Sequence, residues 1–188
     1  MSRITMQTNQ LNITLMPLQP DDREQFILDI QWAFKYGAQQ EFGLRDTRTE
    51  EGEEVISRTT IENSIDGKNA ETYRIILDGK KVGGVVLRIN REKAEGELEL
   101  LFVSPEVHSK GIGQAAWKAV EKMHPEIKVW ETITPYFEKR NIHFYVNCCG
   151  FHIVEFWNKY QHGPAIPEEE AGNWSDDDEM FVLRKVMR

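Results

Sequence analysis

The pattern of apolar and polar residues divides the first third of the chain into one strand and two helices. Partial alternation predicts a strand over residues 11–18, and apolar residues at helical spacing predict a helix over 22–36. A weaker helical pattern runs over 54–65. The charged, glycine-containing stretch 42–54 lies between the two helices and is typical of a loop or a short helix.

The middle of the chain has the pattern of a β-hairpin. A β-rich run over 72–77 and a returning run over 81–90 flank the dipeptide Asp78-Gly79. A type I′ turn needs a positive φ at both central residues, and Asp-Gly is one of the pairs that tolerate it. The two runs are therefore predicted to pair antiparallel.

The hairpin is predicted to continue into a third strand. A polar turn over 91–96 leads into the alternating run 97–103. Inside the preceding strand, the adjacent residues Gly83 and Gly84 indicate a bulge or a close approach of another part of the chain.

The second half of the chain alternates between helices and strands. The elements expected there are a helix over 113–123, a strand over 127–133, a helix over 137–149 that ends at Gly150, a strand over 151–157, a Pro- and acid-rich excursion over 160–178, and a last strand over 180–186. The whole order, β-α-α-β-β-β-α-β-α-β-β, indicates one α/β domain over residues 1–188, with a mixed and mostly antiparallel sheet.

Composition narrows the class of partner. The chain has 188 residues, with 23 basic and 31 acidic side chains and a net charge of −8, and no basic stripe that would indicate nucleic-acid binding. It has no apolar run of membrane-spanning length and no apolar N-terminal signal segment. The two cysteines, Cys148 and Cys149, are adjacent and cannot form a disulfide framework, so a reducing cytoplasm is the expected location. No histidine has metal-ligand spacing, so no metal is expected.

The segment 103–113 carries the strongest chemical signal. It joins a strand to a helix, and Gly111 and Gly113 leave room for a ligand beside the free N–H groups of the first helical turn. Such a turn suits a phosphate or pyrophosphate. A dinucleotide fingerprint, G-x-G-x-x-A over 111–116 with Glu131 twenty residues after Gly111, is one alternative, although the loop before Gly111 is long for it. A turn without a ligand is the other.

The surroundings of this loop resemble the GNAT family of acetyl-CoA-dependent N-acetyltransferases. Three antiparallel strands precede the segment 108–113, His-Ser-Lys-Gly-Ile-Gly, which is similar to the family's (Gln/Arg)-x-x-Gly-x-(Gly/Ala) with His in the first position. A second family mark is a Phe-Tyr pair in a helix that leads into Gly-Phe, here at 144–145 and 150–151. The resemblance covers about residues 72–160.

The resemblance implies a gap between splayed strands 97–103 and 127–133, flanked by helices, in which acetyl-CoA binds. The backbone of the first splayed strand would pair with pantetheine, and the loop would hold the pyrophosphate. The residues that the resemblance assigns to the cofactor are Leu101, Phe102, Val103, His108, Ser109, Lys110, Gly111, Ile112, Gly113, Gln114 and Asn141.

The resemblance also implies direct acyl transfer to a primary amine of a small molecule or a peptide. Glu97 is the first candidate for the general base and Glu99 the second, while alternation in a half-exposed strand explains the same residues without catalysis. Tyr145 is the candidate acid, but Gly150 follows it by five residues where the family spacing is four. The spacing requires the helix to absorb one extra residue, or the phenol turns away.

Two other functions fit the same residues. One is a sensor with this fold that binds acyl-CoA without turnover, and the other is a nicotinamide-binding oxidoreductase. The acceptor is expected to be set by residues 22–65 and 160–178, which carry no motif. Dimers are common in the family that the chain resembles, which makes a homodimer one assembly to test.

Overall fold

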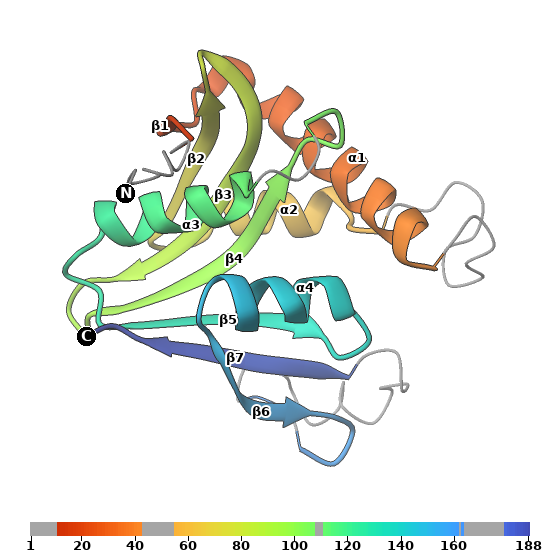
Figure 1. Ribbon diagram of the computed structural model, residues 1–188, viewed down its shortest axis with the longest axis vertical. Helices are drawn as coiled ribbons and strands as arrows, with labels where there is room; N and C mark the ends of the chain where they lie inside the picture. The colour runs from red at the N-terminus through yellow and green to blue at the C-terminus, as the bar shows by residue number, and fades with distance from the viewer. Residues whose placement is uncertain (1–10, 43–54, 108–110, 162, 164–178) are drawn as a thin grey trace, which may run out of the picture.

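The structure is a computed structural model that describes residues 11–42, 55–107, 111–161, 163 and 179–188 (Figure 1). Its helical elements are η1 (Pro20–Asp22), α1 (Arg23–Phe42), α2 (Arg58–Ile65), α3 (Ile112–Met123), α4 (Lys139–His143) and the π-helical turn η2 (Phe144–Cys148). Its strands are β1 (Ile13–Pro17), β2 (Ala70–Leu77), β3 (Lys80–Asn90), β4 (Glu95–Val103), β5 (Val129–Pro135), β6 (His152–Trp157) and β7 (Met180–Val186).

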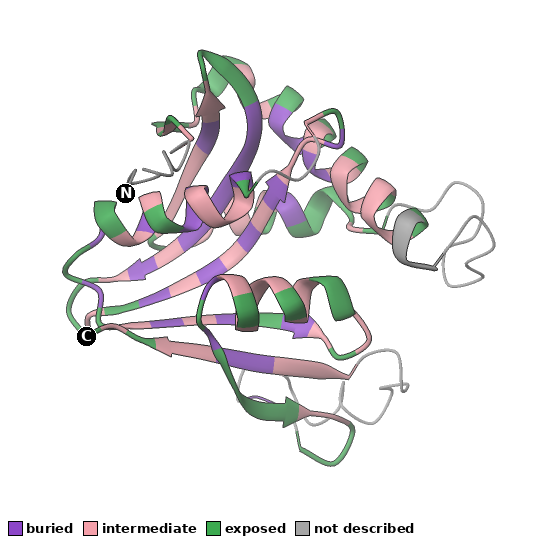
Figure 2. Ribbon diagram, in the orientation of Figure 1, coloured by how far each residue is buried: buried purple, intermediate pink, exposed green. Residues whose placement is uncertain are grey.

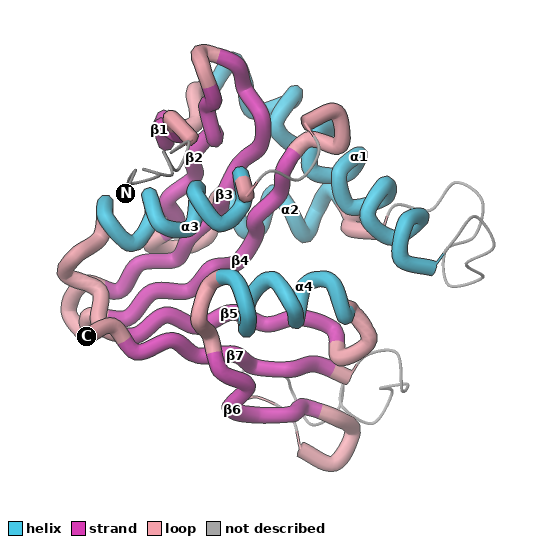
Figure 3. Tube along the Cα trace, in the orientation of Figure 1, coloured by secondary structure: helices cyan, strands magenta, loops and turns pink. Residues whose placement is uncertain are grey.

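The seven strands form one sheet in the order β1-β2-β3-β4-β5-β7-β6. The β4–β5 pair is parallel, and the other neighbouring pairs are antiparallel. Helices α3 and α4 lie on one face of the sheet, and α1 and α2 lie on the other (Figures 1 and 3). This arrangement confirms the predicted α/β class with a mostly antiparallel sheet, and it differs from the parallel doubly wound sheet of dinucleotide-binding folds.

The predicted order of elements is confirmed, and the differences lie at the ends. Helix α1 extends to Phe42, beyond the predicted end at residue 36. Helix α2 begins at Arg58 rather than 54 because Ser57 caps it, with the Ser57 side chain accepting from the Thr60 N–H at 3.1 Å. At the hairpin, Asp78 and Gly79 both have positive φ, 48° and 77°, as a type I′ turn requires.

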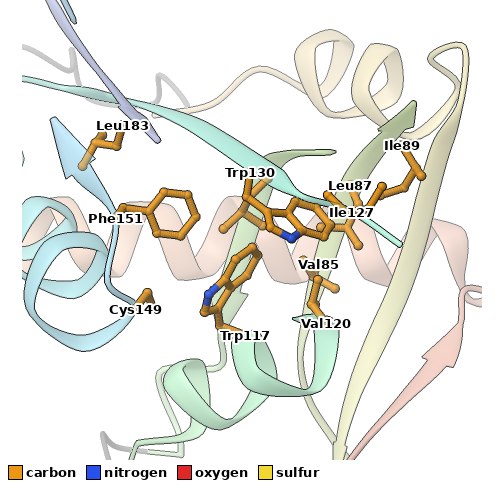
Figure 4. Packing of buried hydrophobic residues seen from close by; sticks show 11 residues of the cluster. Val85, Leu87, Ile89, Trp117, Val120, Ile127, Trp130, Cys149, Phe151 and Leu183 are labelled. Atoms are coloured by element: carbon orange, nitrogen blue, oxygen red, sulfur yellow. The ribbon is translucent and has the colours of Figure 1, made fainter. Parts of the chain in front are cut away.

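Apolar side chains are buried on both faces of the sheet, and many residues of the central strands are buried (Figure 2). Under α3, the rings of Trp117 and Trp130 meet edge to face with centroids 5.2 Å apart, and Phe151 lies at the same distance from Trp117 (Figure 4). Under α1 and α2, Phe26 packs edge to face on Phe102. Because both faces are covered, alternate residues of the central strands are buried on opposite sides.

The glycine pair in β3 combines the two features that the sequence predicts. Ile75 pairs with Gly83 whereas Ile76 pairs with Lys81, so β3 carries one extra residue at Val82. At Gly84, an added Cβ would lie 2.3 Å from the Phe26 ring, so only glycine lets α1 approach the sheet this closely.

Gly84→Ala is expected to destabilise the fold by about 1–3 kcal/mol, because the new methyl group overlaps two buried rings. Gly37→Ala is the matched control. A Cβ there has no atom within 4 Å, and alanine in a helix interior should stabilise by about 0.5–1 kcal/mol. Urea unfolding of both variants measures the difference, and effects of the same sign would contradict this account of Gly84.

The parallel β4–β5 ladder is short, and the strands then separate. Pairing runs from Glu95↔Val129 to Glu97↔Glu131 and covers three residue pairs. Beyond it the two strands diverge towards their C-terminal ends (Figure 1). The divergence leaves one edge of β4 without a neighbouring strand, which is the splay that the family resemblance implies.

A bulge in β4 lies directly after the last paired residues. Val86 pairs with Leu100 and Leu87 with Leu98, so Glu99 has no opposite residue on β3. The bulge reverses the alternation of the strand. Leu98 therefore packs in the cluster under α3, whereas Leu100 packs under α1 and α2.

Candidate active site

The bulge decides which backbone groups of β4 face the gap. The Leu98 carbonyl points towards β5, because it accepts a hydrogen bond from the Thr132 hydroxyl at 2.8 Å. The Ser104 N–H points the other way and donates to a carbonyl of β3 at 2.8 Å. Since backbone groups alternate along a strand, Leu101 and Val103 face the gap. Their N–H and C=O groups are available there for an extended ligand.

Phe102 plays a different part from its two neighbours. Alternation points its backbone groups towards β3, and its ring is buried against Phe26 and close to Gly84. A ligand that ran along β4 as a further strand would bond to alternate residues of it. Phe102 therefore lies between two residues whose backbone groups face the gap, but its own backbone groups do not face it.

The start of α3 supplies a set of free N–H groups. Gly111 has φ 76°, a left-handed conformation that glycine adopts at little cost, and an added Cβ there would meet nothing within 4 Å. The first bond of the helix is from the Ala115 N–H to the Gly111 carbonyl. The N–H groups of Ile112, Gly113 and Gln114 precede it and have no acceptor within the helix. The predicted cofactor residues His108, Ser109 and Lys110 lie outside the described residues.

Three residues at this helix start serve packing, two through their side chains and one through the absence of a side chain. Ile112 is buried in the core. A Cβ at Gly113 would lie 3.1 Å from the Phe144 ring, so the glycine lets η2 approach. Gln114 donates from Nε2 to the Cys148 carbonyl at 2.6 Å. The helix start is thus held in place by side chains while its backbone donors stay available.

Three carboxylates gather where β4 and β5 separate. Alternation places Glu97, Glu99 and Glu131 on the face of the sheet that carries α1 and α2. Arg88 donates from Nε to Glu99 at 2.5 Å, and Arg184 donates from Nε to Glu131 at 2.7 Å. Glu97 lies between them and accepts no hydrogen bond from any residue of the described chain. Glu97 is therefore the one carboxylate of these three that has no ion pair with an arginine of the described ranges.

The environment of Glu97 changes its acidity. Burial raises the pKa of Glu97 above its ordinary value, and the charges of Glu99 and Glu131 raise it further, while Arg88 partly opposes them. A carboxylate with a raised pKa is a stronger base, so Glu97 suits the removal of a proton from an ammonium group better than its neighbours do.

We call the point where β4 and β5 separate, after the pair Glu97 and Glu131, the fork. Tyr145 lies beside the fork on the opposite face of the sheet. Its ring packs against Phe144 and Phe151. Burial raises the pKa of Tyr145 to about 12, and the contact with Thr132 partly opposes this rise. The phenol is therefore protonated at neutral pH and can act as an acid.

The extra residue between Tyr145 and Gly150 is taken up by a π-turn. In η2 the Cys149 N–H donates to the Phe144 carbonyl five residues earlier, at 3.0 Å, and the Phe151 N–H donates to the Tyr145 carbonyl. The predicted α-helix over 137–149 is therefore α4 followed by η2, and it begins later, at Lys139. π-turns of this kind are inserted single residues in an α-helix and are frequent at functional sites.

Asn141 and Thr132 complete the edge of the gap on the β5 side. Asn141 donates from Nδ2 to the Thr134 hydroxyl at 3.4 Å, so it lies against β5. Thr132 and Thr134 are both buried in a strand whose inward positions begin with Trp130. Thr132 is not among the residues that the sequence predicts for the site. Its signal is a hydroxyl at an inward position of a strand that is otherwise expected to bury apolar side chains.

A hollow of about 360 Å³ lies elsewhere, between α1 and the C-terminal end of β4. Its lining includes Gln25, Trp32 and Ser104, but none of the three clustered carboxylates. Within the described ranges, no group of three or more His, Cys, Asp or Glu side chains is arranged to hold a metal ion. No helix in the same ranges has the length and apolarity to cross a membrane.

Known proteins resemble this chain in sequence and in fold. An uncharacterized protein of Bacillus subtilis (strain 168), YrkN, is 41% identical over 183 residues, which cover 96% of each chain. The PaiA N-acetyltransferase of Thermoplasma acidophilum, solved with coenzyme A, is 18% identical and superposes with a TM-score of 0.64 over 94% of this chain and 100% of its own. A Bacillus subtilis acetyltransferase solved with CoA is 17% identical, with a TM-score of 0.57 over 95% of this chain and 100% of its own.

These two structures share the fold with the chain. The sequence itself matches a family profile, described as the acetyltransferase (GNAT) family, over residues 25–151. That match spans the two helices on one face, the splayed strands, the glycine loop and the π-turn. The chain belongs to the GNAT family of acetyltransferases.

Proposed function

We propose that this protein transfers an acetyl group from acetyl-CoA to a primary amine of a small molecule or a peptide. The observation that carries the proposal is the pair of groups at the fork. Glu97, an uncompensated carboxylate, lies on one face of the sheet and Tyr145, a partly buried phenol, lies on the other. A thioester held in the gap would have a base on the side of the incoming amine and an acid on the side of the departing thiol.

The cofactor would bind along the free edge of β4. Leu101 and Val103 would pair with the amide groups of pantetheine, and the N–H groups at the start of α3 would hold the pyrophosphate. Both known structures compared above contain CoA, which supports this assignment. Asn141 is placed at the β5 side of the same gap, against Thr134.

Glu97 and Tyr145 can together carry the proton transfers that acetyl transfer requires. Glu97 takes a proton from the substrate ammonium, and the neutral amine nitrogen then bonds to the thioester carbon. Gap-facing N–H groups stabilise the oxyanion that forms. The C–S bond breaks, the thiolate takes the Tyr145 proton, and the phenolate regains a proton from the amide nitrogen. Glu97 releases its proton to water, so an ammonium and acetyl-CoA give an amide, CoA and one proton.

The test is to incubate the protein with acetyl-CoA and a panel of polyamines, aminoglycosides, amino acids and peptides. The proposal expects CoA release that depends on the amine, matched one to one by a product that is heavier by one acetyl group. A sensor without turnover would bind acetyl-CoA and release CoA with none of the amines, and this result would replace the proposed function.

Gly111→Asp is expected to weaken acetyl-CoA binding by at least about tenfold, because it places a carboxylate where the pyrophosphate would lie. Gly79→Asp is a matched control. Gly79 also has φ 77° and an open Cβ position, but it belongs to the β2–β3 hairpin turn. Calorimetric titration with acetyl-CoA compares the two. Equal affinities in folded variants would remove Gly111 from the cofactor site.

A further inference from the structure

The π-turn that carries Tyr145 ends in two backbone carbonyls that are capped from outside it. Carbonyl groups at the end of a helix have no N–H partner within the helix and need a donor from elsewhere. Here the Cys148 carbonyl accepts from Gln114 Nε2 at 2.6 Å. The Cys149 carbonyl accepts from Lys185 Nζ, also at 2.6 Å. Gln114 belongs to α3 and Lys185 to β7, so contacts between distant parts of the chain fix the end of η2.

Helix α3 is connected to both of these carbonyls. Gln114 reaches the first directly, whereas Glu121 forms an ion pair with the Lys185 ammonium that reaches the second. Residues 114 and 121 are two helical turns apart, so they lie on the same face of α3. The Lys185 and Glu121 side chains are 21% and 17% exposed, so water screens their attraction only in part. One face of α3 therefore holds the π-turn at two points.

Gln114 also belongs to the cofactor end of the site. Its backbone N–H is one of the first in α3, which have no acceptor within the helix and would face the pyrophosphate. Its side chain donates to the π-turn instead. The neighbouring Gly113 lets the two elements touch, because a Cβ there would lie 3.1 Å from the Phe144 ring. A displacement of the start of α3 would therefore also displace the turn that carries Tyr145.

We propose that the Gln114 side chain is a positioning group that connects the cofactor site to the acid step. Its amide holds the end of η2 in the place from which the Tyr145 hydroxyl reaches the departing thiolate. This inference rests on the proposed function for its catalytic consequence. The cap itself, from Gln114 to the Cys148 carbonyl, is independent of any acceptor substrate. The side chain thus has a role separate from that of the backbone N–H of the same residue.

Gln114→Met removes the donor and keeps the length and helix propensity of the side chain. We expect kcat to fall about 10–100-fold, the effect of a small displacement of a reacting group. The KM for acetyl-CoA should stay near that of the parent, because the backbone N–H groups remain. Gln114→Lys keeps a donor and should restore most of kcat at saturating acetyl-CoA. Gln19→Met is the matched control, since Gln19 Nε2 also donates to a backbone carbonyl, that of Pro17 at 3.0 Å, outside both α3 and η2.

The Tyr145→Phe protein provides a second readout. If the Gln114 side chain acts by positioning the phenol, its loss should matter little once the phenol is gone. Gln114→Met should therefore lower the kcat of the Tyr145→Phe protein by less than about threefold, far below its effect in the parent. A merely structural role would lower kcat by the same factor in both backgrounds, and this result would overturn the positioning role.

A third measurement needs no amine substrate. The Cys149 N–H donates to the Phe144 carbonyl across the π-turn at 3.0 Å, so its hydrogen exchange reports how often the turn opens. We expect this amide to exchange at least about tenfold faster in Gln114→Met than in the parent and in Gln19→Met, while amides of β2 and β3 keep their rates. Gln114→Asn, whose amide is one methylene shorter, provides the same comparison if the methionine variant does not fold.

The outcomes separate the two proposals. Faster Cys149 exchange in Gln114→Met, in a protein that acetylates no amine, would retain the cap and overturn the proposed function. Amine acetylation with unchanged Cys149 exchange, with a methionine variant as fast as the parent, or with a lysine variant as slow as the methionine variant would overturn the role of Gln114.

Discussion

Glu97→Gln is expected to lower kcat/KM by about 10²–10⁴-fold, the usual contribution of a general base. Glutamine keeps the shape of the side chain and removes its basicity. The effect should be largest at the pH where the parent is most active, because the parent gains activity as Glu97 loses its proton. Initial rates across pH with one identified amine measure it. A loss below threefold would assign deprotonation to water or to another residue.

Glu99→Gln provides the control for Glu97. Arg88 holds Glu99, so glutamine there should leave the maximal rate within a few-fold of the parent. It also removes a negative charge that raises the pKa of Glu97. The acidic limb of the pH profile should therefore move to lower pH in Glu99→Gln, whereas it should disappear in Glu97→Gln. A limb that stays in place in both variants would show that it belongs to another group.

The raised pKa of Glu97 also has a consequence for stability. The folded state binds this proton more tightly than the unfolded state does, so the stabilisation is present at low pH and is lost as the pH rises through the raised pKa. At neutral pH the ionised Glu97 opposes folding. Glu97→Gln should accordingly raise the urea midpoint at neutral pH and leave it nearly unchanged at acidic pH.

Tyr145→Phe is expected to reduce kcat by about 10²-fold or more and to leave acetyl-CoA affinity intact, because only the hydroxyl is lost while the ring still packs on Phe151. The need for an acid falls as the leaving thiol becomes more acidic. With acetyl thioesters of more acidic thiols, the kcat of Tyr145→Phe should therefore be closer to the kcat of the parent. Steady-state rates for a series of such thioesters provide the test.

Tyr136→Phe is the matched change outside the site, since Tyr136 is more than one-third exposed and packs its ring on Phe137 and Phe156. It should leave kcat within twofold of the parent. If Tyr145→Phe lost the same small factor for every leaving group, the thiolate would take its proton from water and the phenol would be a packing residue.

Much of the fold could be predicted from local patterns. The Asp78-Gly79 turn, the order of elements and the glycine loop each depend on residues that are close in the sequence. The β4 bulge could not be predicted in this way. The run Glu97-Leu98-Glu99-Leu100 alternates strictly, yet Leu98 and Leu100 are buried on opposite faces. Because helices cover both faces, both arrangements bury apolar side chains, and pairing with β3 decides between them.

In the candidate site, too, the sequence predicts some features and the folded sheet determines the others. The carboxylates on β4 and β5 follow from alternation, but the arginines that distinguish them come from other strands, Arg88 from β3 and Arg184 from β7. Only the folded sheet brings Arg88 to Glu99 and Arg184 to Glu131 and leaves Glu97 without a cation. The choice of base is therefore a property of strand order rather than of the motif.

The π-turn bears on how this chain should be compared with its relatives. An alignment without a gap between the Phe-Tyr and Gly-Phe marks would set Val146 against the relatives' tyrosine and would suggest that the hydroxyl had been lost. The i→i−5 bond from Cys149 to Phe144 locates the inserted residue inside one helical turn. The alignment gap in the relatives therefore belongs opposite residues 146–149. The conservation of Tyr145 among relatives should be judged only after the alignment gap is placed there.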